Sequence, residues 1–97
     1  MKKLNFKILA FRIVNKKISL KEVEGYQIDS IAAVYRERPY WYVTELVSGT
    51  CICKGKTKQD ALNEYQKDET KEKIAKAHKT DAYKHLKKYF EEMKGQN

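Results

Sequence analysis

The sequence predicts an α+β fold, in which a small antiparallel sheet of three to five strands is followed by one long or two shorter C-terminal helices. Three observations lead to it. Strand-forming residues dominate residues 4–14, and residues 40–62 contain two strand patterns around a Ser-Gly turn signal. From position 56 to position 94 there is neither Gly nor Pro, which favours helix. We expect one domain over residues 1–97, with residues 1–55 mainly β and residues 56–95 helical.

Residues 4–14 are expected to form the first strand. Leu4, Phe6 and Ile8 fall on one face of an extended chain. A helix with Leu4, Ile8 and Phe11 on one side is the alternative. The strand is favoured because β-branched and aromatic residues dominate the segment.

Turn signals separate the next elements. Residues 15–17 are expected to turn, and residues 18–24 are compatible with either a strand or one helical turn. Gly25 is expected to end that element. Residues 26–36 alternate in the manner of a further strand, and residues 37–39 end in a proline that suits a turn.

Two more strands are expected over residues 40–48 and 50–54, joined by the Ser48-Gly49 turn signal. Thr57 then begins a helix, because its hydroxyl is suited to accept a hydrogen bond from a free N–H group of the first turn. Asp60, three residues later, completes a capping box.

The helical tract allows two interpretations. One is a single helix of about 37 residues, about 55 Å long at 1.5 Å per residue. The other is two helices broken near residues 67–71 or 79–81. The clearest amphipathic pattern lies at the C-terminus, where it repeats with the spacing of a helix. This face must pack on the sheet or on another copy of the chain, and it consists of Tyr83, Leu86, Tyr89, Phe90 and Met93.

The charge is unevenly distributed. The net charge is +8, and residues 1–21 contain seven basic residues and no acid, whereas residues 22–53 have a net charge of −3. A basic excess suggests a polyanionic partner such as nucleic acid, and the alternative is a lysine-rich composition that reflects solubility and the base composition of the genome. No run of about 18 apolar residues predicts a membrane span and no signal-peptide pattern occurs, so we expect a cytoplasmic protein without a membrane partner.

A lysine-rich loop is the candidate binding site. Three lysines alternate through residues 54–58, across an expected helix N-terminus whose free N–H groups favour anions. Lysines add charge for phosphate, and the nearby Tyr40-Trp41-Tyr42 segment offers rings for base stacking or for ordinary cross-strand packing. The alternative is a capped helix with solvated lysines. The candidate nucleic-acid-binding residues are Lys54, Lys56, Lys58, Arg36 and Arg38.

No catalytic or metal site is predicted. Side chains two apart on a strand lie about 6.5–7 Å apart, at the limit for a disulfide, so Cys51 and Cys53 are expected to be free thiols. A zinc site would also need His78 and His85, which would lie about 10.5 Å apart along one helix. No phosphate-binding glycine motif occurs. We therefore expect a non-enzymatic protein with no cofactor and no metal.

The segment from about residue 40 to 65 has a hairpin, a short strand and a helix start marked by Gly49, Gly55, Thr57, Asp60, Ala61 and Leu62. With this pattern it resembles the strand-strand-helix module of HicB-type antitoxins. It is also similar to the last strand and helix of double-stranded-RNA-binding domains, on Gly55, Thr57, Lys58 and Ala61. As a small, lysine- and tyrosine-rich chain, the protein is similar overall to uncharacterised proteins of phages and mobile elements.

Together these patterns favour a small basic, non-catalytic protein that binds nucleic acid through the loop between strand and helix. The alternative is a protein-interaction or self-associating module, a dimer for example, that uses the C-terminal amphipathic face of residues 83–93.

Overall fold

The computed structural model describes residues 1–12 and 17–95 of the chain. Within them, five strands form one antiparallel sheet in sequence order, and three helices follow. The α+β class with a small sheet is thereby confirmed. The strands are β1 (Lys2–Arg12), β2 (Lys17–Gln27), β3 (Ala32–Glu37), β4 (Tyr40–Glu45) and β5 (Cys51–Gly55), and the helices are α1 (Lys58–Gln66), α2 (Asp68–His78) and α3 (Asp81–Lys94).

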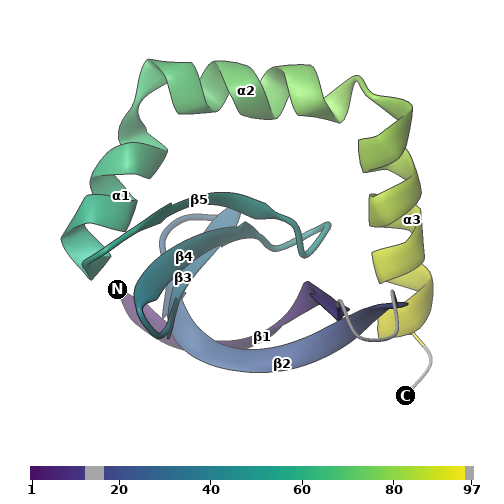
Figure 1. Cartoon of the computed structure of the whole chain (residues 1–97), viewed down its shortest axis with the longest axis horizontal. Helices are drawn as coiled ribbons and strands as arrows, with labels where there is room; N and C mark the ends of the chain where they lie inside the picture. Colours follow the sequence, from purple (N-terminus) through teal and green to yellow (C-terminus); the bar gives the residue numbers. More distant parts are fainter. Residues whose placement is uncertain (13–16, 96–97) are drawn as a thin grey trace.

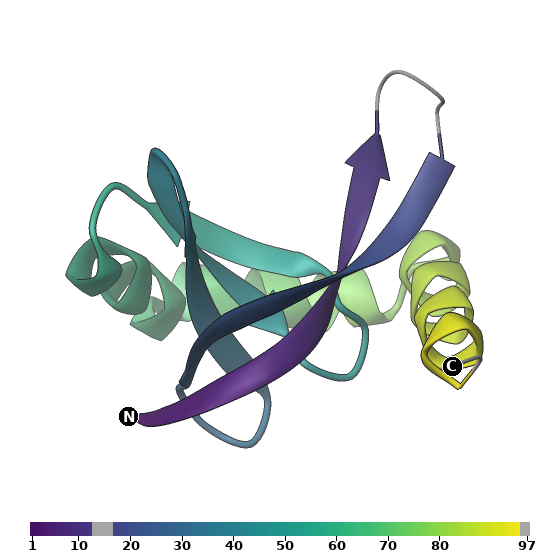
Figure 2. The same cartoon turned by 90° about the horizontal axis from the view of Figure 1, so that it is seen from below.

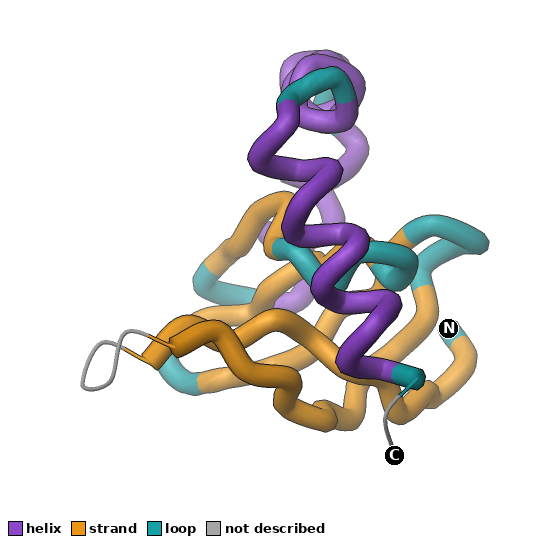
Figure 3. Tube along the Cα trace, turned by 90° about the vertical axis from the view of Figure 1, so that its right-hand side faces the viewer, coloured by secondary structure: helices purple, strands orange, loops and turns teal. Residues whose placement is uncertain are grey.

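The helices form an arch over the sheet. In Figure 1, α1 lies at one end of β5, α2 crosses above the strands, and α3 descends towards the hairpin of β1 and β2. In Figure 3, which looks along the arch, α2 lies above the strands, and α3, in front, descends across them to the C-terminus. Among the described residues, no helix is both long and apolar enough to span a membrane.

The number of helices corrects the expectation, because both of the breaks considered from the sequence occur. At the first, Lys67 has an extended backbone (φ −66°, ψ 140°), and the Thr70 hydroxyl donates to the Glu64 carbonyl at 2.7 Å. At the second, the Thr80 hydroxyl accepts a hydrogen bond from the Tyr83 N–H at 3.2 Å and so caps α3. Such side-chain bonds to the backbone compete with a continuous helix.

The boundary between β2 and β3 also differs from the expectation. β2 continues through Gly25, and β3 begins only at Ala32, so the strand expected over residues 26–36 is wrong in its first part. The cause is Asp29, whose carboxylate accepts hydrogen bonds from the N–H groups of Ile31 and Ala32 at 2.8 and 2.9 Å. This local turn replaces strand pairing over residues 28–31, between β2 and β3.

The remaining elements follow the prediction with small shifts. Residues 2–12 are strand rather than helix, and the ambiguous segment 18–24 is strand as well. Residues 13–16, which include most of the expected first turn, lie outside the described residues. β4 ends at Glu45, three residues early, because the Gly49 N–H turns back to the Glu45 carbonyl at 2.8 Å.

The sheet curls so strongly that β1 meets the loop between β4 and β5. The Leu9 N–H of β1 donates to the Gly49 carbonyl, in the loop between β4 and β5, at 2.9 Å. Figure 2 shows the hairpin of β1 and β2 crossing beneath the other strands. Phe6, Ile8 and Tyr35 form the core inside this curl.

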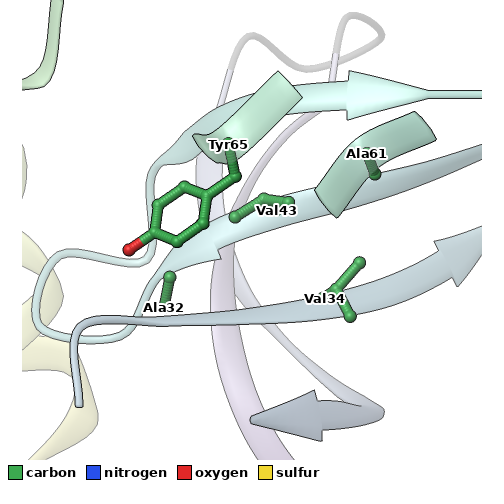
Figure 4. Packing of buried hydrophobic residues seen from close by; sticks show 5 residues of the cluster. All are labelled: Ala32, Val34, Val43, Ala61 and Tyr65. Carbon is green, nitrogen blue, oxygen red and sulfur yellow. The ribbon is translucent and has the colours of Figure 1, made fainter. Parts of the chain in front are cut away.

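A second core lies outside the curl, between the sheet and α1. Ala61 and Tyr65 face the strands from α1, as Figure 4 shows, and both are buried. Their strand partners, Ala32, Val34 and Val43, are fully buried. The apolar face of this helix is thus directed at the sheet, and it fixes the first turn of α1 relative to β5.

We predict that Gly49→Ala destabilises the fold. Gly49 has a φ of +69°, and a Cβ there would lie 2.5 Å from the Phe90 ring and 3.0 Å from the Leu9 nitrogen. The conformation alone costs a non-glycine residue roughly 1–3 kcal/mol, and the clash adds to that cost. Urea unfolding should show a clearly lower midpoint.

Gly95→Ala is the matched control, because the nearest atoms to its added Cβ lie 3.6 Å away and its φ is −80°. It should be neutral or slightly stabilising. Equal unfolding midpoints for the two variants would contradict the close packing of Gly49 against Phe90 and Leu9.

Candidate nucleic-acid interface

Strand register brings the predicted basic residues to one end of the sheet. Arg36 of β3 pairs with Trp41 of β4, and Trp41 pairs with Gly55, the last residue of β5. Arg38 lies in the turn between β3 and β4, and Lys56 follows Gly55. The turn and the β5–α1 connection lie close together in Figures 1 and 2. We call this surface the basic end, and its cations are Arg36, Arg38, Lys54, Lys56 and Lys58.

The basic end extends over both faces of the sheet. Successive side chains of a strand point to opposite faces. Trp41 packs on the core beneath α1, whereas Tyr42 packs on the core inside the curl. Lys54 pairs with Tyr42 and so shares its face, while Arg36 shares the face of Trp41. The predicted residues therefore form a rim around the end of the sheet rather than a patch on one face.

Two of the lysines are held over tyrosine rings. The Lys54 Nζ lies 4.5 Å from the centroid of the Tyr40 ring, and the Lys58 Nζ lies 3.9 Å from that of Tyr26. At exposed sites such a contact contributes about 0.5–1 kcal/mol. It orients the ammonium group and leaves its charge intact. The role of Tyr26 was not predicted, because β2 is about thirty residues from Lys58 in the sequence.

The cations of the basic end are not neutralised by ion pairs. Elsewhere on the sheet, Lys3 pairs with Glu24 at 2.6 Å and Lys21 pairs with Glu37 at 2.8 Å. Within the described part of the chain, no carboxylate lies in ion-pair distance of any cation of the basic end. Two acids are close to these cations in sequence: Glu37, which lies between Arg36 and Arg38 but pairs with Lys21, and Asp60 in the first turn of α1.

The predicted helix cap is confirmed. The Asp60 N–H donates to the Thr57 hydroxyl at 3.0 Å, and the Ala61 N–H donates to the Thr57 carbonyl at 3.1 Å. A Cβ on Gly55 would lie 2.4 Å from the Ala61 nitrogen. The lack of a side chain at this glycine therefore lets β5 run directly into α1, and it holds the lysines on either side of Gly55 close to the first turn of the helix.

A groove lies inside the curl, next to the basic end. It has a volume of about 670 Å³ and opens to solvent at Lys21 and Glu37, which are exposed. We call it the inner groove. It is lined by Ile8, Leu9, Ala10, Ser19, Leu20, Lys21, Tyr35, Glu37, Tyr42 and Cys51.

The other end of β4 carries a buried carboxylate that the sequence did not single out. Glu45 is 2 % exposed. Its carboxylate accepts from the Ser48 hydroxyl at 2.6 Å and from the Tyr83 hydroxyl, and its second oxygen lies 2.7 Å from the His78 Nε2. Burial alone raises the pKa of a carboxyl group, but these hydrogen bonds outweigh it, and the pKa of Glu45 is lowered.

The bond to this carboxylate also affects Tyr83. Burial and the hydrogen bond to Glu45 raise the pKa of Tyr83 to about 12. The His78 and Tyr83 rings stack with centroids 4.4 Å apart. Together Glu45, His78 and Tyr83 fasten the corner between α2 and α3 to the sheet.

The cysteines are free thiols, as predicted. Cys51 and His78 both line a small cleft of about 130 Å³ beneath the corner of α2 and α3. The Cys51 thiol donates to the Cys53 carbonyl at 3.5 Å, while His78 is bonded to Glu45. Desolvation raises the pKa of Cys51 against the opposing effect of Lys54. A raised pKa disfavours the thiolate, which is the nucleophilic form of the thiol.

The predicted interface of α3 packs within the chain. Phe90 is 1 % exposed, the Tyr89 hydroxyl donates to the Ile18 carbonyl at 2.7 Å, and Tyr83 is bonded to Glu45. Leu86 and Met93 are half-buried. Of the two packings considered from the sequence, the structure contains the one on the sheet, and self-association through this face stays a prediction.

Comparison with known proteins gives no relative: no family model, no curated protein and no solved structure matches the chain. The described residues contain no group of three or more His, Cys, Asp or Glu side chains arranged to hold a metal ion.

We predict that Glu45 makes stability sensitive to acid. Because its pKa is lowered by folding from an ordinary value of 4.5, its contribution is complete above that value and is lost as the pH falls through the folded-state pKa. Glu45→Gln should unfold more easily at neutral pH, by about 1–3 kcal/mol. Its unfolding midpoint in urea should also fall less than that of the parent chain between pH 7 and pH 3.5.

Glu72→Gln is the control, because Glu72 is exposed on α2 and has no hydrogen bond among the described residues. It should leave both the midpoint and its pH dependence unchanged. If Glu45→Gln retains the full acid sensitivity of the parent chain, the sensitivity arises from other carboxylates.

Proposed function

We propose that the protein is a non-catalytic nucleic-acid-binding protein that contacts phosphates with its basic end. The observation that carries the proposal is the concentration of five cations at one end of the sheet without an ion pair, while Lys3 and Lys21 on the same sheet are paired with acids. Unpaired cations on a rigid scaffold are suited to displace the counterions of a phosphate backbone.

The tyrosine rings support this proposal. Because Lys54 and Lys58 are already positioned over Tyr40 and Tyr26, less side-chain freedom is lost when a phosphate binds. Arg36 adds a guanidinium 6.0 Å from the Trp41 ring. The first turn of α1 contributes its positive dipole end, which Asp60 partly offsets. The lysines therefore supply most of the attraction.

We predict that replacing Lys54, Lys56 and Lys58 together by Gln weakens binding to nucleic acid. Each lost phosphate contact should lower the slope of log affinity against log salt by about one, so the triple variant should have a slope smaller by about three. Fluorescence anisotropy with a labelled 12-mer oligonucleotide, measured from low to physiological salt, gives both the affinity and the slope.

The control removes the same charge elsewhere. Lys76, Lys79 and Lys84 are exposed on and between α2 and α3, away from the basic end. Their joint replacement by Gln should change the affinity much less. Equal losses for the two triple variants would show attraction by net charge alone and would overturn the assigned site, and no binding by the parent chain would overturn the function.

A further inference from the structure

The inner groove exists because β2 separates from β3. The hairpin of β1 and β2 pairs over eleven residues on each strand, but β2 pairs with β3 only from Gly25 to Gln27. Beyond Gly25 the hairpin passes over the inner face of the sheet, and the Leu9–Gly49 hydrogen bond holds it there at the far side. The groove between them, of about 670 Å³, falls within the range of about 300–1,000 Å³ found for small-molecule sites.

One wall of the groove is aromatic, and the wall formed by the hairpin includes two small side chains. Tyr35 and Tyr42 stack with ring centroids 5.6 Å apart and an interplanar angle of 23°. Ala10 and Ser19, a cross-strand pair of the hairpin, also line the groove. Tyr42 is half-buried and lines the groove, so a ligand in the groove can reach its side chain. Small side chains beside an aromatic ring leave room for a flat group to lie against that ring.

The tyrosines connect the groove to the basic end. The Tyr40 ring lies edge-on to Tyr42 at 6.3 Å and carries the Lys54 ammonium at 4.5 Å. Lys54 is also the cross-strand partner of Tyr42. A cation and an aromatic ring therefore stand side by side where the basic end meets the groove. Proteins that bind single strands combine these two elements, because the rings stack on the bases and the cations follow the phosphates.

The charges around the groove favour a neutral base over a phosphate inside it. Lys21 at its mouth is paired with Glu37 at 2.8 Å, so the carboxylate opposes an anion entering there. The Ser19 hydroxyl, by contrast, is suited to hydrogen-bond the edge of a neutral base. The phosphates are then left to the unpaired cations of the basic end.

From this arrangement we infer that the inner groove receives an unpaired base, stacked on Tyr42, so that the ligand is single-stranded rather than double-stranded nucleic acid. The inference rests on the proposed function and names the ligand class of the same site. In a duplex each base is enclosed between its neighbours and its partner, so it cannot enter a groove of this kind without being unpaired.

The test compares three labelled 12-mers at one salt concentration: a mixed-sequence single strand, an abasic strand of the same length, and a duplex. The single strand should bind most tightly, by about 5- to 150-fold over the abasic strand, which corresponds to one stacked base. Tyr42→Leu should lower affinity for the single strand to that for the abasic strand and leave abasic binding unchanged. Tyr42→Phe, which keeps the ring, should bind as the parent does.

A second variant guards against loss of fold, since Tyr42 also packs on the inner core. Ser19→Phe places a ring in the groove from the hairpin side and should weaken binding of the single strand only. Ser30→Phe, at an exposed position in the turn before β3, should have no effect.

The outcomes separate this inference from the proposed function. If abasic strand and single strand bind equally, or if neither Tyr42→Leu nor Ser19→Phe changes their ratio, the inference is overturned while phosphate binding at the basic end stands. A duplex bound more tightly than the single strand overturns it as well. If none of the three oligonucleotides binds, the proposed function fails and the inference fails with it.

Discussion

The burial of one carboxylate is central to how α2 and α3 are attached to the sheet. Glu45 lies on β4 at a position that alternation directs towards the core, and a buried charge is tolerated only with partners. Ser48 is a local partner, whereas His78 and Tyr83 come from α2 and α3. Because α2 itself buries little besides Thr70, this cluster and the contact of Phe90 with Gly49 hold the arch in place.

The Glu45 cluster, which anchors α2 and α3, and the basic end lie at opposite ends of the hairpin formed by β3 and β4. In the register of β3 and β4, Ala32 pairs with Glu45 at one end, and Arg36 pairs with Trp41 close to the other. Between them, Val34 and Val43 are fully buried. Because the basic end is separated from the anchor by a packed core, its side chains are free of any role in attaching α2 and α3.

The sequence predicted the elements that depend on neighbouring residues. The Thr57 cap is an example, since all of its bonds close within four positions of the chain. The start of β3 was missed because Asp29 offers side-chain bonds that alternation does not reveal. The Glu45 cluster, by contrast, joins Glu45 to His78, which is 33 positions away in the sequence, and to Tyr83, which is 38 positions away. The only sign of this cluster in the sequence was an acidic residue at a strand position that should face the core. That sign did not identify the residues that bond to it.

The same distinction applies to the candidate site. The cations were predictable, because alternating lysines before a capped helix form a local pattern. Their arrangement was not, because Lys58 rests on Tyr26 and the inner groove depends on where β2 separates from β3. That separation also places Tyr42 in a groove next to Lys54. The alternation of β4 thus has two consequences: Trp41 completes the core under α1, while Tyr40 and Tyr42 give the opposite face its aromatic surface. Because β4 packs against a core on each face, charged side chains and exposed aromatic rings meet at its end, in the basic end.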